Sequence, residues 1–492
     1  MKLIMNIQQE MKRNSGDKMC ILVITVISAL FITFGEGNIG YVLGGDSEAY
    51  YLHFRHHIGV APLYPLFIHV INLLVGEAYY LNVAAAVQIA FLVYSIIFFV
   101  NTIRQEFRLK WYETILVWGA SMLPFVILLP EDPIGHTIMT ESFTYPLTYL
   151  TMTFLIKGIF RQGEKDFIIS LVLCIISGLI RSQMLFLFVV TGAAYFYMVI
   201  RRCQKRGERS ITSSKFWIRI AVACMITLLG MKSVSWLTIV YEKVFFDAPA
   251  VAYSDQTLVQ HMLYLADGED ERLFEDEHIR EIFIRCYQGM MEQESNYIHQ
   301  EEGLAAWQKI VGDCGANSYL LTEVIEEYYG SMGTLPEDPI EKEVLIADIS
   351  HQLAYPLLKV HWQDKAAEAF DLIPAGFVST VLFHKLEIYG IIHIATLLFY
   401  VIGTLLACFY YSRRKEDKRA AELILLFFFA SAVNVIACNI VHFGLQRYLA
   451  YTMGLNWAGI LLLLRGFKES QAVNSPFSFG EIFSGHRNRK IQ

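Results

Sequence analysis

Asp46 and Glu48 lie in a short stretch that combines carboxylates with aromatic and cationic side chains. Two glycines precede the stretch, so the backbone can turn tightly there. A helix beginning at the first carboxylate would carry four of these side chains on one face: Asp46, Tyr50, His53 and His57. A carboxylate among aromatic rings and histidines can act as a general base. Alternatively, Asp46 only caps a helix at a membrane surface.

Cations stand near the expected outer ends of apolar segments at Arg181, Lys232 and Arg447, and Glu141 opens another such segment. Basic residues of membrane proteins normally gather on the cytoplasmic side, so cations on the other side need an explanation. An anionic partner is one, because Arg and Lys supply the donors and the charge that a phosphate requires. The alternative is that each long side chain reaches the interface independently.

Metal sites are weakly indicated by the sequence. His53, His56 and His57 have i, i+3, i+4 spacing, but the remaining ligands would have to come from elsewhere, so we predict no metal site there. A divalent cation at Asp46 and Glu48 stays an alternative, because two carboxylates are too few to define a site. The chain has no phosphate-binding glycine loop and no metalloprotease or serine-hydrolase motif.

The composition predicts an all-α polytopic membrane protein. Of 492 residues, 55% are hydrophobic, and several apolar runs approach the ~20 residues that cross a bilayer. The basic start has no small-residue cleavage site, so we expect a retained first span rather than a signal peptide. Ten spans place every basic loop and both termini in the cytoplasm of a cell-membrane protein: 19–34, 79–100, 111–130, 142–160, 167–180, 184–200, 216–240, 387–411, 421–443 and 448–464. The short apolar run 62–75 suits an interfacial helix.

Charge divides the chain into regions. Residues 242–371 hold 27 acidic and 8 basic residues, which leaves 20 acidic and 32 basic residues elsewhere. Amphipathic runs predict a mostly helical extracytoplasmic domain at 241–386, between membrane modules at 1–240 and 387–466 and a cytoplasmic tail at 467–492. Cys286 and Cys314 in this domain form one disulfide or stay as free thiols; both remain open. The basic residues form loop clusters and no single stripe, which argues against nucleic-acid binding.

The chain resembles the C-type membrane glycosyltransferases (GT-C superfamily), in particular bacterial relatives of protein mannosyltransferase and lipid A aminoarabinose transferase. The resemblance covers most of 19–240 and 420–465. It rests on short motifs: Asp46 after the first span, Pro62-Leu63-Tyr64-Pro65-Leu66, Thr140-Glu141-Ser142, Gly178-Leu179-Ile180-Arg181-Ser182-Gln183 and Gln446-Arg447-Tyr448. Two features depart from the family. The first loop has a lone Asp-Ser-Glu instead of a double acid, and the acidic domain has no counterpart that aligns.

This resemblance implies a glycosyltransferase that moves a sugar from a polyprenyl-phosphate donor to an extracytoplasmic glycan, lipid or protein. Asp46 would deprotonate or orient the acceptor hydroxyl, and Glu141 would orient neighbouring groups or share the acceptor. Arg181, Lys232 or Arg447 would stabilise the departing lipid phosphate. Glu48, Tyr50, His53 and Tyr448 would complete the substrate-binding set, with membrane lipids around the site. The need for a metal stays open.

Other functions fit parts of the pattern. A flippase or transporter would carry charges or broken helices near the middle of several spans, whereas the charges here lie toward span ends. A polysaccharide polymerase or ligase would also use outer arginines, so Arg181 and Arg447 fit it equally. A non-enzymatic scaffold would leave the ordered set of outer motifs unexplained. Loss of activity in Asp46→Asn would favour the glycosyltransferase, and tolerance would favour the polymerase, ligase or flippase.

Overall fold

The computed structural model describes residues 2–34, 40–56, 60–128, 133–205, 214–247, 253–299, 306–382, 389–413, 417–441 and 445–474. Within these ranges the chain is helical, and one isolated bridge joins Val42 to Thr137. The bundle helices are α1 (Lys2–Phe34), α5 (Tyr80–Phe107), α6 (Trp111–Leu128), α7 (Glu141–Arg161), α8 (Glu164–Ile180), α9 (Phe186–Lys205), α10 (Ser214–Phe246), α15 (Tyr389–Arg413), α16 (Arg419–Val441) and α18 (Met453–Asn474). The predicted all-α class is therefore confirmed for the described residues.

Six helical segments are long and apolar enough to cross a membrane, among the described residues: Tyr80–Phe107, Trp111–Leu128, Ser182–Cys203, Phe216–Phe246, Ile391–Arg413 and Arg419–Ile440. The chain is accordingly a helical membrane protein. The other four predicted spans are also helical, but 19–34 belongs to an apolar stretch of fewer than 18 residues, and 142–160, 167–180 and 448–464 are not among the six. The count of ten thus stays a prediction.

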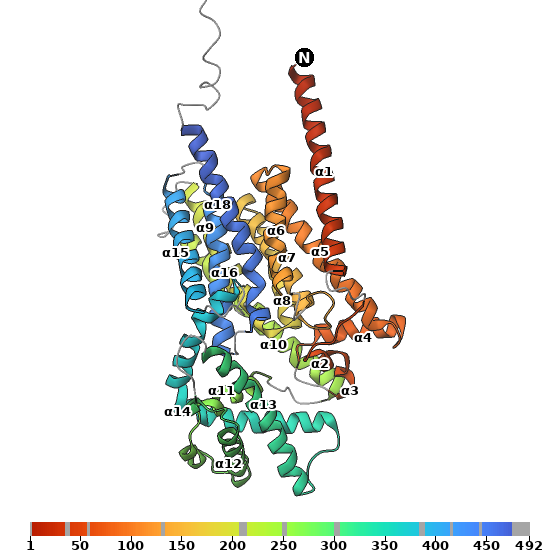
Figure 1. Ribbon diagram of the computed structural model, residues 1–492, viewed down its shortest axis with the longest axis vertical. Coiled ribbons are helices and arrows are strands. Elements are labelled where there is room, and N and C mark those ends of the chain that lie inside the picture. Colours follow the sequence, from red (N-terminus) through yellow and green to blue (C-terminus); the bar gives the residue numbers. More distant parts are fainter. Residues whose placement is uncertain are drawn as a thin grey trace, which may run out of the picture.

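The turns at one end of the bundle are joined by ion pairs. Arg161 contacts Glu106 at 2.6 Å, and Arg465 contacts Glu113 at 3.0 Å. The N-terminus lies toward this same end, and the helices of the acidic region lie at the opposite end (Figure 1). These described basic turns and the acidic region therefore lie at opposite ends of the molecule, which agrees with the charge pattern.

Short helices cap the end near the acidic region: α2 (Ser47–Tyr51), α3 (His53–His56), α4 (Leu63–Val75) and α17 (Gln446–Leu449), with 3₁₀ turns η1 (Ser182–Leu185) and η5 (Ala450–Thr452). Helix α4 has 13 residues, too few to cross a bilayer. Its Tyr64 and Ile68 are buried, whereas Leu73 and Leu74 are both 74% exposed. The interfacial position predicted for this helix suits its exposed leucines and stays a prediction.

The acidic region packs a core of its own from α11 (Tyr253–Leu265), α12 (Glu277–Glu292), α13 (Ala306–Ser331) and α14 (Pro339–Ser379), with short turns η3 (Gly268–Leu273) and η4 (Tyr297–His299). In α12 the buried positions recur with helical spacing: Ile279, Ile282, Phe283, Cys286 and Met290. Two helices have aspartate caps, because Asp276 and Asp338 each accept two backbone N–H groups. Cys286 and Cys314 are both free thiols, so of the two alternatives the free thiols are observed and the disulfide is not.

Candidate functional site

Hydrogen bonds join the two loops that carry the predicted acids, at residues that precede each acid in the sequence. The amide of Val42 donates to the carbonyl of His136, and the amide of Ile138 donates to the carbonyl of Val42, both at 3.0 Å. The buried ring of His136 fixes the same junction, since its two nitrogens lie 2.7 Å from the Gly40 carbonyl and 2.6 Å from the Ile32 carbonyl. These contacts bring the start of α2 close to the start of α7.

A buried amide supports the second loop from below. Gln88 on α5 donates to the carbonyls of Gly135 and Thr137 at 3.0 and 3.2 Å, and accepts from the hydroxyl of Tyr64 at 2.6 Å. The Gln88 amide and these three partners are therefore hydrogen-bonded in a region where an unpaired polar group would be costly. This network links α4, α5 and the loop that leads into Glu141.

Glu141 is the centre of the site. Its side chain is only 1% exposed, and its Oε1 accepts from Arg181 Nη1 at 3.0 Å while Arg447 Nε lies 3.3 Å from the same oxygen. The other oxygen accepts from the Thr140 hydroxyl at 3.1 Å. A carboxylate shared by two guanidinium groups is a strong, directional anchor. Glu141 thus fixes two arginines that are distant in sequence.

Arg447 also contacts the first acid. Its Nη2 donates to Asp46 Oδ2 at 2.7 Å, and the Asp46 side chain is 44% exposed. Asp46 precedes α2 but makes no capping hydrogen bond, so its carboxylate is used in this ion pair and the capping alternative fails. The four charged groups are arranged as a chain from Asp46 through Arg447 and Glu141 to Arg181, and their charges sum to zero.

The ring of Tyr448 packs against the guanidinium groups of both arginines. The Arg181 guanidinium lies 4.0 Å from the centre of the Tyr448 ring, and that of Arg447 lies 5.1 Å away. The backbone of Tyr448 is held by Gln183 and Asn434, which donate to its carbonyl at 2.9 and 3.1 Å. Stacking of this kind orients planar guanidinium groups and adds a favourable cation–π term.

Tyr50 lies at the edge of the cluster, with its ring 5.1 Å edge-on from Tyr64. Burial raises the pKa of the Tyr50 hydroxyl, Arg181 opposes this, and the carboxylates of Glu141 and Asp46 raise it further. The phenol therefore stays protonated and can donate a hydrogen bond. Four predicted residues thus form the charged cluster, and a fifth packs its ring against it: Asp46, Glu141, Arg181, Arg447 and Tyr448. Tyr50 adjoins this group.

Three other predicted residues are not brought to the cluster by any described contact. Glu48 is exposed and accepts from the hydroxyl of Tyr51 at 3.3 Å. Lys232 lies on an exposed face of α10. His53 is buried among aromatic rings, stacked on Tyr241 and edge-on to Phe246. The proposed continuous helix from Asp46 to His57 is wrong, since α2 ends at Tyr51 and α3 begins at His53, which turns the histidine away.

Some predicted residues fall outside the described part of the chain. These are Glu131, Asp132, His57 and His442, and the side chain of His56 is likewise not described. Sequence reasoning missed Gln88 as a support and Thr140 as a contact of Arg181, whose Nη1 lies 2.8 Å from the hydroxyl. Thr140 had a signal, because it opens the same helix as Glu141. Gln88 had none, since it interrupts an apolar run as many structural amides do.

A cavity of about 630 Å³ lies between α1 and α5, with Thr33, Ala86, Ile89 and Tyr94 among its lining residues. The charged cluster does not line this cavity. The lining residues of the cavity come from α1 and α5, and no residue of the loop that precedes Glu141 is among them.

Comparison with protein-family models, curated proteins and solved structures finds no match to this chain.

Proposed function

We propose that this protein is a glycosyltransferase that moves a sugar from a polyprenyl-phosphate donor to an acceptor outside the cytoplasm. The observation that carries the proposal is the shared use of Arg447 by a buried and an exposed carboxylate. Glu141 is 1% exposed and Asp46 is 44% exposed, although both contact the same guanidinium group. One partner of Arg447 is thus fixed, whereas the other can exchange with a ligand.

An anionic donor fits this arrangement. A phosphate oxygen that approaches Arg447 would compete with the exposed Asp46 carboxylate, while Glu141 continues to hold the guanidinium in place. Arg181 is fixed by the same carboxylate and is 14% exposed, so it can contribute a second set of donors. Preorganised cations stabilise the charge that develops on a leaving phosphate without the cost of reorganising them.

Release of Asp46 from Arg447 supplies the base. The acceptor hydroxyl oxygen forms a bond to the anomeric carbon, and the bond between this carbon and the phosphate oxygen breaks. The electron pair of that bond leaves with the lipid phosphate, and Asp46 takes the hydroxyl proton. The attack and the departure occur on opposite faces of the sugar, so this single displacement inverts the anomeric configuration. A general base typically contributes ~10²–10⁴-fold to such a step.

The location supports a lipid-linked donor and an outer acceptor. Leu445, which precedes α17, packs against the core of the acidic region, so the site lies between that region and the membrane helices. The apolar cavity between α1 and α5 has the lining that a polyprenyl chain needs. The described basic turns, with Arg161 and Arg465, lie at the other end, and the positive-inside rule assigns such turns to the cytoplasm, which supports an extracytoplasmic site.

The test is sugar release or transfer from radiolabelled polyprenyl-phosphate sugars by the purified protein in detergent. Wild type is compared with Asp46→Asn at equal thermal stability, with a panel of glycan, lipid and peptide acceptors. We expect turnover by wild type and its loss in the variant. Equal turnover by both would exclude Asp46 as the base. Lipid movement in proteoliposomes without sugar transfer would instead support the flippase alternative.

A further inference from the structure

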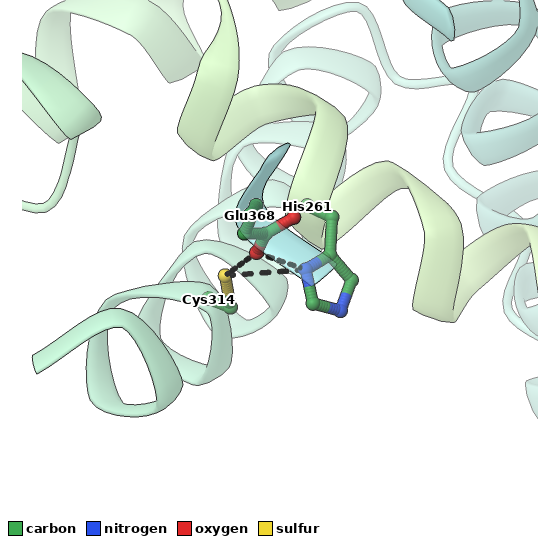
Figure 2. A group of neighbouring side chains, drawn as sticks. All are labelled: His261, Cys314 and Glu368. Carbon is green, nitrogen blue, oxygen red and sulfur yellow. Dashed lines mark hydrogen bonds and ion pairs between the residues drawn. The ribbon is translucent and has the colours of Figure 1, made fainter. Parts of the chain in front are cut away.

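A second polar cluster lies inside the acidic region, apart from the charged site. His261 on α11, Cys314 on α13 and Glu368 on α14 come from three different helices and are 0%, 0% and 6% exposed. Figure 2 shows the thiol, the carboxylate and the Nδ1 edge of the imidazole pointing toward one another. One ligand atom from each residue lies within 4.8 Å of the others.

We propose that His261, Cys314 and Glu368 bind a zinc ion that ties α11, α13 and α14 together. Nitrogen, sulfur and carboxylate oxygen are the three donor types that proteins use for zinc. Sites with hard oxygen donors only would suit magnesium or calcium, whereas a thiolate beside an imidazole selects zinc over both. This inference is independent of the glycosyltransferase proposal.

The separations of the donor atoms are close to those of a tetrahedral site. Cys314 Sγ lies 3.7 Å from His261 Nδ1 and 4.0 Å from Glu368 Oε1. Zinc bonds of ~2.0–2.3 Å at tetrahedral angles place ligand atoms roughly 3.3–3.6 Å apart. Nδ1 and Oε1 are only 2.7 Å apart, because a hydrogen bond joins them in the metal-free protein. Zinc would replace the bridging proton and open that separation to roughly 3.3 Å.

Zinc binding would change the protonation of two of the ligands. Burial and the nearby Lys365 lower the pKa of His261 despite Glu368, so the imidazole is neutral and Nδ1–H donates to Glu368. Burial raises the pKa of the Cys314 thiol well above its usual range, which keeps it protonated without a metal. Zinc binding would move the imidazole proton from Nδ1 to Nε2 and release one proton from the thiol to solvent.

Lys365 and Tyr264 complete the surroundings. The Lys365 ammonium lies 2.8 Å from Glu368 Oε2, so it orients the carboxylate with Oε1 toward the other two donors and offsets one negative charge. The Tyr264 hydroxyl is buried and has no hydrogen-bond partner among the described residues. Three protein ligands leave the fourth zinc position to a water molecule.

The experiment uses the full chain, purified in detergent without chelators and then equilibrated with zinc. Metal content is measured by mass spectrometry of the monodisperse fraction for wild type, Cys314→Ser and His261→Gln. The matched control is Cys286→Ser, which alters the other buried thiol of the same core. We expect one tightly bound zinc ion in wild type and in the control, and an affinity more than about ten-fold lower in the two ligand variants.

Cobalt substitution of wild type tests the proposal without any variant. Cobalt bound at the site should show a thiolate-to-cobalt charge-transfer band and the intense visible bands of tetrahedral coordination. Absence of tight zinc in wild type, or zinc binding unchanged in Cys314→Ser, would overturn the proposal. Cobalt spectra without a thiolate band would do the same. Any of these results would leave the three residues as a buried hydrogen-bonded group.

Discussion

Arg447 Nη2 lies 2.7 Å from Asp46 Oδ2, which joins a residue of the first loop to a residue 401 positions later in the chain. The same guanidinium contacts Glu141 through Nε, so three segments meet at one side chain. Because the Asp46 carboxylate is the most exposed member of this chain of charges, it is the partner that a phosphate can displace. The predictions below concern this site and the parts of the fold that hold it.

Asp46→Asn should reduce turnover by about 10²–10⁴-fold, because an amide cannot accept the acceptor proton. Stability should change little, since a half-exposed ion pair contributes only ~0–1 kcal/mol. Single-turnover transfer from a radiolabelled donor measures the effect. Glu48→Gln is the matched control, because it neutralises an exposed carboxylate two residues away. An equal loss in the control would show that loop charge in general, and not Asp46, controls turnover.

Arg447→Lys should lower kcat/KM by roughly ten- to a hundred-fold, because a lysine cannot bridge Asp46 and Glu141 while presenting further donors to a phosphate. The comparison variant is Lys232→Met, which removes an exposed cation of α10 that makes no described contact with the cluster. It should behave as wild type in the same donor-concentration series. If Lys232→Met were the more damaging change, the phosphate site would have to be sought along α10.

Gln88→Leu should destabilise the protein by about 1–3 kcal/mol, because it leaves the carbonyls of Gly135 and Thr137 and the hydroxyl of Tyr64 without this amide partner. The loop before Glu141 should loosen, so kcat should also fall. Thermal unfolding and faster hydrogen exchange in the peptide covering residues 133–141 would reveal the change. Unaltered exchange in that peptide would contradict a supporting role for Gln88.

Gly454→Ala should destabilise the contact between α6 and α18. A Cβ at this position would lie 2.9 Å from the Ala120 carbonyl oxygen and 3.0 Å from the Ser121 Cα, and backbone atoms cannot move aside cheaply. The expected cost is about 1–3 kcal/mol in thermal or denaturant unfolding. Gly119→Ala on α6 is the control, because its Cβ would meet nothing within 4 Å. A similar cost in both variants would point to helix flexibility instead of close packing.

His361 should make the acidic region less stable as pH rises. Burial alone would lower the pKa of this histidine, but hydrogen bonds to Asp270 and Asp364 raise it above the ordinary value of 6.5. A raised pKa in the folded state means that the stabilisation is complete below about pH 6.5 and is lost as pH rises through the higher folded value. Melting temperatures measured across this window should fall in wild type.

His361→Gln should remove that part of the pH dependence, because glutamine does not titrate. His278→Gln provides a comparison on the exposed surface of α12, where the slope should persist. A wild-type stability that rises between neutral and mildly alkaline pH would contradict the assignment to His361.

The sequence alone determined the helical membrane class, because the length and apolarity of each segment are local properties. It also singled out Asp46, Glu141, Arg181 and Arg447 as candidates, since each is a charge near the beginning or end of an apolar segment. Tertiary structure decided which charges meet. Lys232 resembles Arg181 in sequence, yet lies on an exposed face of α10, and no local pattern records the direction of that face.

In the acidic region, too, the sequence does not show which side chains of distant helices come together. A disulfide between Cys286 and Cys314 and a pair of free thiols were equally compatible with the sequence, because the sequence does not give the distance between two helices. The fold instead places Cys314 beside His261 and Glu368, which lie on other helices and are 53 and 54 residues away in the sequence. Helix formation depends on neighbours within a few residues, whereas a site depends on packing between distant segments, and only the folded chain brings those segments together.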